Sequence, residues 1–161
     1  MKEDLERYFV ETVRNTRHGM YRVALALLHS PADAEDAVSR AVEVAWRHLP
    51  RLRQQEALPA YLMKSAVNAA KDELRRRKKA GLPEEALSSV AAPDDGSPIA
   101  HYVSGLPEKY RIPVLLKFGE NMTEKEIAIT LGLPRGTVSS RISRALDMLR
   151  KEIKKEEAGH A

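Results

Sequence analysis

Apolar side chains recur along this chain at intervals of three and four residues, the period of an amphipathic helix. The clearest run in the N-terminal part consists of Met20, Val23, Ala24, Leu27 and Leu28. Further runs with the same period follow as far as Ile153. The pattern predicts an all-α protein.

Helix boundaries in the first half follow from capping signals. Ser30, Pro31 and Asp33 supply an N-cap hydroxyl, a proline at the first helical position and an acid near the positive helix end. The helix that begins there should end at Pro50, because proline cannot donate to the helical ladder. Its apolar side is Ala34, Ala37, Val38, Ala41, Ala45 and Leu49. Residues 51–58 are then a loop.

A further helix is expected from Pro59, with one packed face and one basic face. The packed face carries Leu62, Ala66, Ala69, Ala70 and Leu74, and the other carries Lys64, Asn68, Lys71, Arg75 and Lys78. Lys79 ends a basic run that begins at Arg75. Such a run suits phosphate contacts, although capping of a helix end and solubility explain it as well.

Residues 81–98 separate two lobes. The segment combines glycine, proline, serine and acids without sustained periodicity, so we expect a flexible linker. The predicted organisation is therefore a domain at 1–80, the linker, and a second small helical domain at 99–161.

The second lobe contains the signals of a helix-turn-helix. A helix opening at Pro107 should carry Ile112, Leu115 and Leu116 and end before Gly119. Thr123 and Glu126 form a capping box, and the helix it starts should end at Gly132. The next helix is expected over residues 135–152. Its inward residues should be Val138, Ile142, Ala145, Leu149 and Ile153, and the tail from Lys154 should fray.

The outer face of that last helix carries residue types that read DNA grooves. They are Thr137, Ser140, Arg144, Asp147 and Lys151, with Arg135 and Arg141 on the flanks. Arginine pairs bidentately with guanine, and hydroxyl side chains contact bases or phosphates. A plain helical hairpin with a solvated outer face is the alternative.

Charge and composition add to this picture. Residues 1–80 carry sixteen Lys and Arg against eleven Asp and Glu, residues 81–98 carry four acids alone, and residues 99–161 carry eleven bases against eight acids. Two basic lobes fit a protein that meets a polyanion at two places. Cysteine is absent and the five histidines lack ligand spacing, so we expect no metal and no cofactor.

Some classes of protein are not expected. No apolar run approaches the roughly 20 residues that span a bilayer, and the polar N-terminus has no signal-peptide pattern, which predicts a cytoplasmic protein without membrane insertion. No nucleophile elbow or glycine-rich phosphate loop appears, so neither an enzyme nor a small-molecule substrate is expected.

Two stretches resemble the extracytoplasmic-function (ECF) family of bacterial RNA polymerase sigma factors. DAEDAV at residues 33–38, Trp46, Tyr61, Leu62 and NAAKDELRRR at residues 68–77 are similar to the family's second conserved region. LPEKYR at residues 106–111, EIA at 126–128 and LGLPRGTVSSRISRA at 131–145 are similar to its fourth region. The resemblance implies a promoter-recognition subunit that borrows its catalysis from the polymerase.

The resemblance also implies roles for individual residues. The helix of residues 33–46 would dock on the clamp helices of the polymerase's largest subunit, with Asp33, Glu35, Asp36, Ser39, Arg40 and Trp46 as the contact residues. The loop of residues 51–59 would capture an unstacked base of the minus-ten element, a form of base flipping. The minus-ten contacts would be Arg51, Arg53, Lys64, Asn68, Lys71, Arg75, Arg76 and Arg77.

Further implied partners follow from the fourth region. The helix from Arg135 would read the minus-thirty-five element as duplex, through Arg135, Thr137, Ser139, Ser140, Arg141 and Arg144. The polymerase flap is a second implied polymerase contact. An anti-sigma factor would hold activity in check by wedging between the lobes or covering their binding faces.

The sequence departs from the family pattern in the first lobe. Ser39 stands where glutamine is usual, Val42 where an aromatic residue is usual, and Tyr61 where tryptophan is usual. Two alternatives therefore stay open. One is an ordinary helix-turn-helix regulator with a dimerisation or sensing lobe, and the other is a sigma-like protein that binds polymerase or an anti-sigma factor but does not melt DNA.

Overall fold

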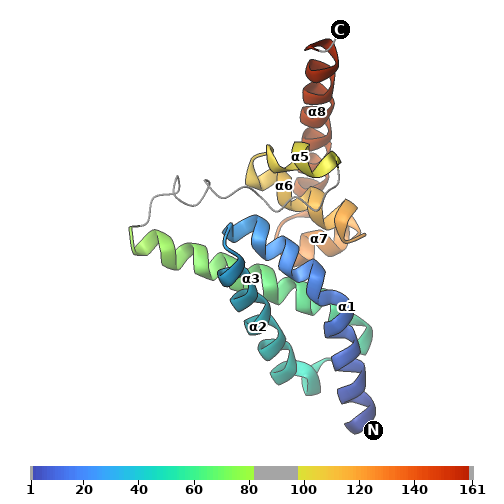
Figure 1. The fold of residues 1–161 in the computed structure, drawn as a ribbon. Coiled ribbons are helices and arrows are strands. Elements are labelled where there is room, and N and C mark those ends of the chain that lie inside the picture. The colour runs from blue at the N-terminus through green and yellow to red at the C-terminus, as the bar shows by residue number, and fades with distance from the viewer. Residues whose placement is uncertain (1, 82–97, 160–161) are drawn as a thin grey trace. The chain divides into compact units, whose positions relative to one another are not determined.

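Three long helices build the N-terminal part of the chain (Figure 1). They are α1 (Lys2–Leu28), α2 (Pro31–His48) and α3 (Leu58–Lys79), and each packs against the other two. The computed structural model describes residues 2–81 and 98–159, and every regular element within them is helical. The expected all-α fold is confirmed.

The turn between α1 and α2 is only two residues long because its caps are strong. His29 has a left-handed backbone (φ 53°), and its N–H donates to the Leu25 carbonyl at 2.8 Å. Ser30 follows as the N-cap of α2, where its side chain accepts from the Asp33 N–H at 3.3 Å. This cap, predicted from the sequence, is confirmed.

The connection from α2 to α3 is more ordered than the expected loop. Two short 3-10 turns, η1 (Leu49–Arg51) and η2 (Gln55–Ala57), lie within it, and α3 begins at Leu58, one residue before Pro59. The Tyr8 hydroxyl of α1 donates to the Gln55 carbonyl at 2.8 Å. The connection is therefore fastened to the bundle.

The core of this unit combines large side chains with small ones. Met20, Leu28, Leu58 and Leu62 of α1 and α3 are fully buried. The buried positions of α2 are Ala34, Ala37, Val38, Ala41 and Ala45. Because alanine is small, α2 can lie close to both partners, and its larger side chains face outward.

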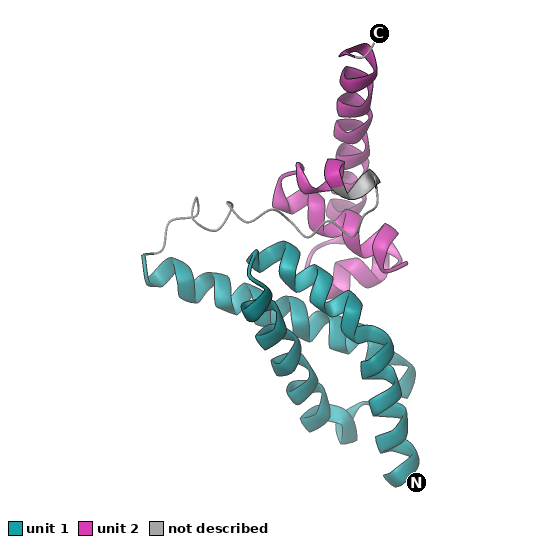
Figure 2. Ribbon diagram, viewed as in Figure 1, with its two compact units in different colours: residues 1–90 teal, residues 91–161 magenta. Residues whose placement is uncertain are grey.

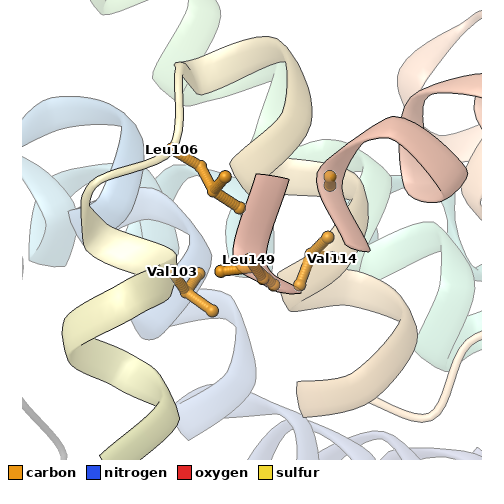
Figure 3. Close-up of a cluster of buried hydrophobic side chains, with 5 residues drawn as sticks. Val103, Leu106, Val114 and Leu149 are labelled. Atoms are coloured by element: carbon orange, nitrogen blue, oxygen red, sulfur yellow. The ribbon is translucent and has the colours of Figure 1, made fainter. Parts of the chain in front are cut away.

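The C-terminal unit contains a shorter set of helices. They are α5 (Pro98–Ser104), α6 (Glu108–Val114), the π-helical turn η3 (Leu115–Gly119), α7 (Glu124–Leu131) and α8 (Arg135–Gly159). Val103, Leu106, Val114, Ala145 and Leu149 form one of its buried clusters, drawn from α5, α6, α8 and the α5–α6 turn (Figure 3). Tyr102, Tyr110, Leu115 and Leu146 pack around that cluster.

The predicted helix from Pro107 to Gly119 exists, with a change of geometry inside it. Pro113 has no N–H to donate to the helical ladder, and a π turn follows at η3. The Glu120 N–H closes that turn on the Leu115 carbonyl at 3.2 Å.

The end of α8 differs from the prediction. The helix continues to Gly159 instead of fraying from Lys154, and its last turns project past the other helices of its unit (Figure 1). Ile153, predicted to face inward, is 37% exposed. The helical period continues there, but the other helices of the unit offer Ile153 little surface to pack against.

Two compact units result, residues 1–90 and 91–161 (Figure 2). The division between them lies inside the segment predicted as a linker. That prediction concerns residues 81–98, of which 82–97 lie outside the described residues.

Candidate nucleic-acid and protein interfaces

The outward face of α2 presents four of the predicted polymerase contacts. Glu35, Asp36, Ser39 and Arg40 are all exposed. The alanine side of α2 is buried, and a residue next in sequence to a buried position points about 100° away around the helix. These four side chains therefore face solvent. The face is mixed in charge and open to a partner.

Trp46 lies further along α2 and is 46% exposed. The edge of its ring meets Phe9 of α1, with centroids 5.1 Å apart and planes at 63°. Phe9 itself is buried. One part of the indole is therefore anchored in the bundle, while the remainder offers a large apolar surface next to the charged face of α2.

Arg77 does not fit its predicted role as a DNA contact. Its side chain is buried, forms an ion pair with Asp33, and donates to the Leu28 carbonyl at 2.9 Å. Glu73 lies 3.5 Å from its Nε. The guanidinium thus joins the last turn of α3 to the start of α2, and Asp33 is committed to that pair.

The predicted basic face of α3 lies largely toward solvent. Lys64, Asn68, Arg75 and Lys78 are exposed, and Lys71 is partly buried. Four of these five side chains are cationic, and Arg76, also exposed, lies beside them, so this face can follow a phosphate backbone.

Acids on α3 partly balance two of these cations. Arg75 pairs with Asp72 at 2.7 Å and Arg76 with Glu73 at 2.6 Å. The hydrogen bond from Arg76 lowers the pKa of Glu73 and raises the pKa of Arg76. Arg75 and Asp72 are both exposed, so their pair contributes little to stability and Arg75 can turn to an incoming phosphate at small cost. Glu73 is largely buried, and if Arg76 turned to a phosphate, Arg77 would still lie 3.5 Å from this carboxylate.

A pocket of about 340 Å³ lies between α2 and α3. The lining consists of Arg40, Val44, Tyr61, Lys64, Ser65, Asn68, Ala69 and Asp72. Lys64 and Asn68, predicted as DNA contacts, thus meet Arg40, predicted as a polymerase contact. Tyr61 and Ser65 were not among the predicted site residues. Helical spacing from Asn68 places Tyr61 and Ser65 on its side of α3, a signal that the sequence did contain.

The remaining predicted minus-ten residues lie in the α2–α3 connection. Arg51 and Arg53 are exposed there. Nearby, the rings of His48 and Tyr61 lie 5.8 Å apart, which links the end of α2 to the start of α3. Two cationic side chains therefore lie in the connection that joins the end of α2 to the start of α3.

The helix-turn-helix is formed by α7 and α8. Thr123 and Glu126 make both bonds of the predicted capping box, at 3.1 and 3.0 Å. Gly132 ends α7 in a left-handed conformation (φ 66°), as its predicted place at the turn requires. The Leu133 N–H then donates to the Ala128 carbonyl at 3.0 Å, and α8 starts at Arg135.

Ser139 has a different place from the one predicted. Its hydroxyl donates to Glu124 of α7, which also accepts from Lys117 at 3.1 Å. These two hydrogen bonds, that of Ser139 first, lower the pKa of Glu124. Ser139 thus ties the two helices of the motif together, and we remove it from the candidate DNA contacts.

The other predicted residues of α8 do lie on its outer side. Arg135, Ser140 and Arg144 are exposed, and Thr137 and Arg141 are partly exposed. Opposite them, Val138, Ile142, Ala145 and Leu149 are buried. Thr137, Ser140, Arg141 and Arg144 converge on a second pocket of about 340 Å³, together with Gly136 and with Lys109 and Tyr110 of α6. Lys109 and Tyr110, which belong to the LPEKYR stretch, were not among the predicted site residues.

Within 2–81 and 98–159, no group of three or more His, Cys, Asp or Glu side chains is placed to hold a metal ion. In the same part of the chain, no helix combines the length and apolar character needed to cross a membrane.

Each of the two units matches a known protein family. The family described as Sigma-70 region 2 matches residues 12–80, and the family described as Sigma-70, region 4 matches residues 98–149. The first match contains α2 and α3 with their exposed faces. The second contains the helix-turn-helix.

Similar proteins extend over nearly the whole chain. RNA polymerase sigma-E factor of Streptomyces coelicolor is 31% identical and covers 95% of this chain and 89% of its own length. The sigma-E factor of Streptomyces avermitilis is 30% identical, over 90% of this chain and 84% of the relative. The ECF sigma factor SigW of Bacillus subtilis is 25% identical over 91% of this chain and 89% of its own length.

Solved structures show the same fold. The sigma factor RpoE of Bartonella quintana, in complex with the anti-sigma factor NepR, has a TM-score of 0.73 at 19% identity and covers 91% of this chain and 96% of its own. CnrH, in complex with the cytosolic domain of CnrY, has a TM-score of 0.67 at 24% identity, over 93% and 90%. With both units matched and relatives aligned along almost their full lengths, the chain belongs to the ECF sigma factors.

Proposed function

We propose that this sigma factor directs promoter-specific initiation by two separate DNA contacts, as a non-catalytic cytoplasmic subunit of RNA polymerase. The observation that carries the proposal is the pairing of two units, each with an outward basic face on a helix that belongs to a matched sigma region. Promoter specificity then comes from two DNA contacts, one made by each unit.

The α2 face is the proposed polymerase contact. Glu35, Asp36, Ser39 and Arg40 would meet the clamp helices of the largest subunit through charge and hydrogen bonding. Trp46 would supply the apolar anchor, because a half-exposed tryptophan that is already held in place loses little freedom on binding. The anchored ring against Phe9 supports this role.

The α3 stripe is the proposed contact with the minus-ten element. Lys64, Lys71, Arg75 and Arg76 would hold the backbone of the unpaired strand. The pocket between α2 and α3 offers Asn68 and Ser65 as hydrogen-bonding groups and Tyr61 as a stacking surface, which are the features that recognise an unstacked base. Arg51 and Arg53 would extend the track along the α2–α3 connection.

The outer side of α8 is the proposed contact with the minus-thirty-five element. A recognition helix reads the major groove with its N-terminal residues, and here that turn carries Arg135 and Thr137. Ser140, Arg141 and Arg144 follow on the same side. The tie between Ser139 and Glu124 supports this role by setting the angle between the two helices.

An anti-sigma factor is the proposed regulator. RpoE of Bartonella quintana was solved with the anti-sigma factor NepR, and CnrH with the cytosolic domain of CnrY. A protein that covered the α2 face of this chain would block the polymerase contact, and one that covered the α8 face would block the duplex contact. Either would lower initiation.

The polymerase flap is the proposed second polymerase contact. A groove of about 650 Å³ lies between α5 and the C-terminal half of α8, with Tyr102, Leu106, Met148 and Leu149 among its lining. Met148 is 37% exposed. A hydrogen bond of 2.5 Å from the Tyr102 hydroxyl to Glu156 links α5 to α8 at one edge of the groove. The rest of the groove would accept an apolar segment of the flap.

The proposal is tested by adding the purified chain to bacterial core polymerase with fragmented DNA of the source genome, and sequencing the 5′ ends of the transcripts. New starts that share two spaced upstream motifs are expected. Binding to core without new starts would indicate a sigma-like protein that does not melt DNA. Absence of core binding would indicate an ordinary regulator.

A further inference from the structure

The pocket at the start of α8 is built by two helices that are far apart in the sequence. From α8 come Gly136, Thr137, Ser140, Arg141 and Arg144, and from α6 come Lys109 and Tyr110. Its volume of about 340 Å³ exceeds what a phosphate group needs. The pocket therefore leaves room for an anion together with water.

The charge inside this pocket has one sign. Lys109, Arg141 and Arg144 contribute three cations, and no carboxylate is among the described residues that line it. The nearest acid along α8, Asp147, already pairs with Arg150 at 3.2 Å. The first turn of α8 adds the positive end of a long helix dipole.

Tyr110 joins the buried core to the pocket. Its ring packs against the cluster that includes Val114 and Ala145, and the neighbouring cations, Arg144 first and then Lys109, lower the pKa of Tyr110. The Lys109 ammonium lies 5.0 Å from the centre of the same ring. A rigid aromatic side chain thus holds two long cationic side chains at the rim of the pocket.

We propose that Lys109 and Tyr110 complete a binding site for a DNA backbone phosphate, in which Arg144 serves as a phosphate clamp and not as a reader of bases. The inference rests on the proposed duplex contact of α8 and deepens it. It assigns sequence reading to residues outside the clamp, such as Arg135, and anchoring of the duplex to the α6–α8 pocket.

The hydroxyl groups favour a phosphate over a base edge. Thr137 and Ser140 supply short donors near the helix start, and arginine presents two parallel donors that match phosphate oxygens. Arg144 lines the same pocket as the Tyr110 phenol and the Lys109 ammonium, and these neighbours limit the directions left for a bidentate contact with guanine. Phosphate accepts from any of these directions.

Lys109→Gln and Tyr110→Phe test the site in holoenzyme on the duplex promoter recovered by transcript mapping. Lys109 is exposed, and Tyr110→Phe keeps the ring that packs on the core, so folding should be retained. Lys109→Gln should lower affinity about eightfold at about 0.1 M salt and flatten the slope of log K against log salt by about 0.9. Tyr110→Phe should lower affinity about three- to tenfold through loss of the phenol oxygen beside Arg144 and the phosphate.

A second duplex, in which the minus-thirty-five motif is scrambled, distinguishes a phosphate contact from a base contact. A phosphate clamp predicts the same relative loss on both duplexes for both variants. A loss confined to the native motif would overturn the proposal and make Arg144 a base reader. Lys154→Gln, which removes an exposed lysine from the far end of α8, is the matched control and should change neither the affinity nor the slope.

Neutral methylphosphonate linkages, placed one at a time, locate the partner. One or two positions should weaken the wild type about eightfold and weaken Lys109→Gln no further. Competition by inorganic phosphate beyond that of chloride at equal ionic strength would overturn the DNA assignment in favour of a free-anion site. Wild-type holoenzyme that recognises no promoter would overturn the proposed function and this inference together, whereas normal promoter use with unchanged variants would overturn the inference alone.

Discussion

Arg77 and Asp33 lie 44 positions apart in the sequence and form an ion pair that links the end of α3 to the start of α2. Arg77 also donates to the Leu28 carbonyl, at the end of α1. All three helices of the N-terminal unit thus meet at one guanidinium. The pair holds the proposed DNA stripe of α3 in a defined position relative to the proposed polymerase face of α2.

Replacement of Arg77 should destabilise this unit strongly. Arg77→Ala leaves the Leu28 carbonyl and Asp33 without their partner, and we expect the free energy of unfolding to fall by about 3 kcal/mol. Trp46 is the only tryptophan, so its fluorescence in urea reports on this unit alone. Arg75→Ala is the control and should change the stability little, because Arg75 and its partner Asp72 are both exposed. Equal losses from the two variants would contradict the role of Arg77.

Acid should weaken the helix-turn-helix through Glu124. Hydrogen bonds from Ser139 and Lys117 hold the pKa of Glu124 below its ordinary value of 4.5 in the folded state. The carboxylate therefore stabilises the unit fully above the unfolded-state pKa, and this contribution disappears as the pH falls through the lower folded-state pKa.

Thermal unfolding at pH 7 and pH 3, followed by circular dichroism, measures this effect. Glu124→Gln should lower the melting temperature at pH 7 and show a smaller acid-induced decrease than the wild type. Ser139→Ala should do the same in weaker form. Glu152→Gln, at an exposed position of α8, serves as the control. An acid-induced decrease that is as large in Glu124→Gln as in the wild type would remove Glu124 from this role.

Trp46 should matter more for polymerase than for folding. Trp46→Ala removes a half-exposed ring whose contact with Phe9 is worth about 1 kcal/mol as an aromatic pair. As an interface anchor it should lower the affinity for core polymerase at least about tenfold. A competition assay against a labelled sigma factor measures this. Val10→Ala removes another exposed apolar side chain and should leave affinity unchanged; a comparable loss there would argue against a specific anchor at Trp46.

Arg75 and Arg76 should bind the unpaired strand by charge. In the double variant Arg75→Gln, Arg76→Gln, the salt slope for a single-stranded minus-ten oligonucleotide bound to holoenzyme should fall by about 1.4, since each phosphate contact contributes about 0.7. Fluorescence anisotropy over a range of salt concentrations gives the slope. Arg47→Gln, an exposed arginine of α2 paired with Glu43, is the control. An unchanged slope in the double variant would exclude these residues from the strand contact.

Local signals predicted much of the fold. The cap at Ser30, the box of Thr123 and Glu126, and the left-handed Gly132 each depend on neighbours within a few residues, and all three are present in the structure. Helical period also placed Lys64, Asn68 and Arg144 on exposed faces. Such features can be derived without knowledge of the packing.

Long-range contacts were beyond the sequence pattern. Arg77 follows Arg75 and Arg76 in the basic run, but it lies seven residues after Ala70, so the helical period alone places it on the packed face of α3. What the period could not give is its partners, Asp33 and the Leu28 carbonyl. Ser139 lies beside the groove-reading residues, yet its hydroxyl meets Glu124 across the turn. Periodicity predicted an inward Ile153, but a helix face is buried only where another element covers it.

The separate duties of the two units are tested most directly by measuring strand unpairing with permanganate on the mapped promoter, with each upstream motif scrambled in turn. Scrambling the distal motif should weaken holoenzyme binding to the duplex, while thymines still become reactive at saturating holoenzyme. Scrambling the proximal motif should abolish that reactivity while duplex binding persists. Unpairing that is indifferent to the proximal motif, or that occurs with core polymerase alone, would contradict the account.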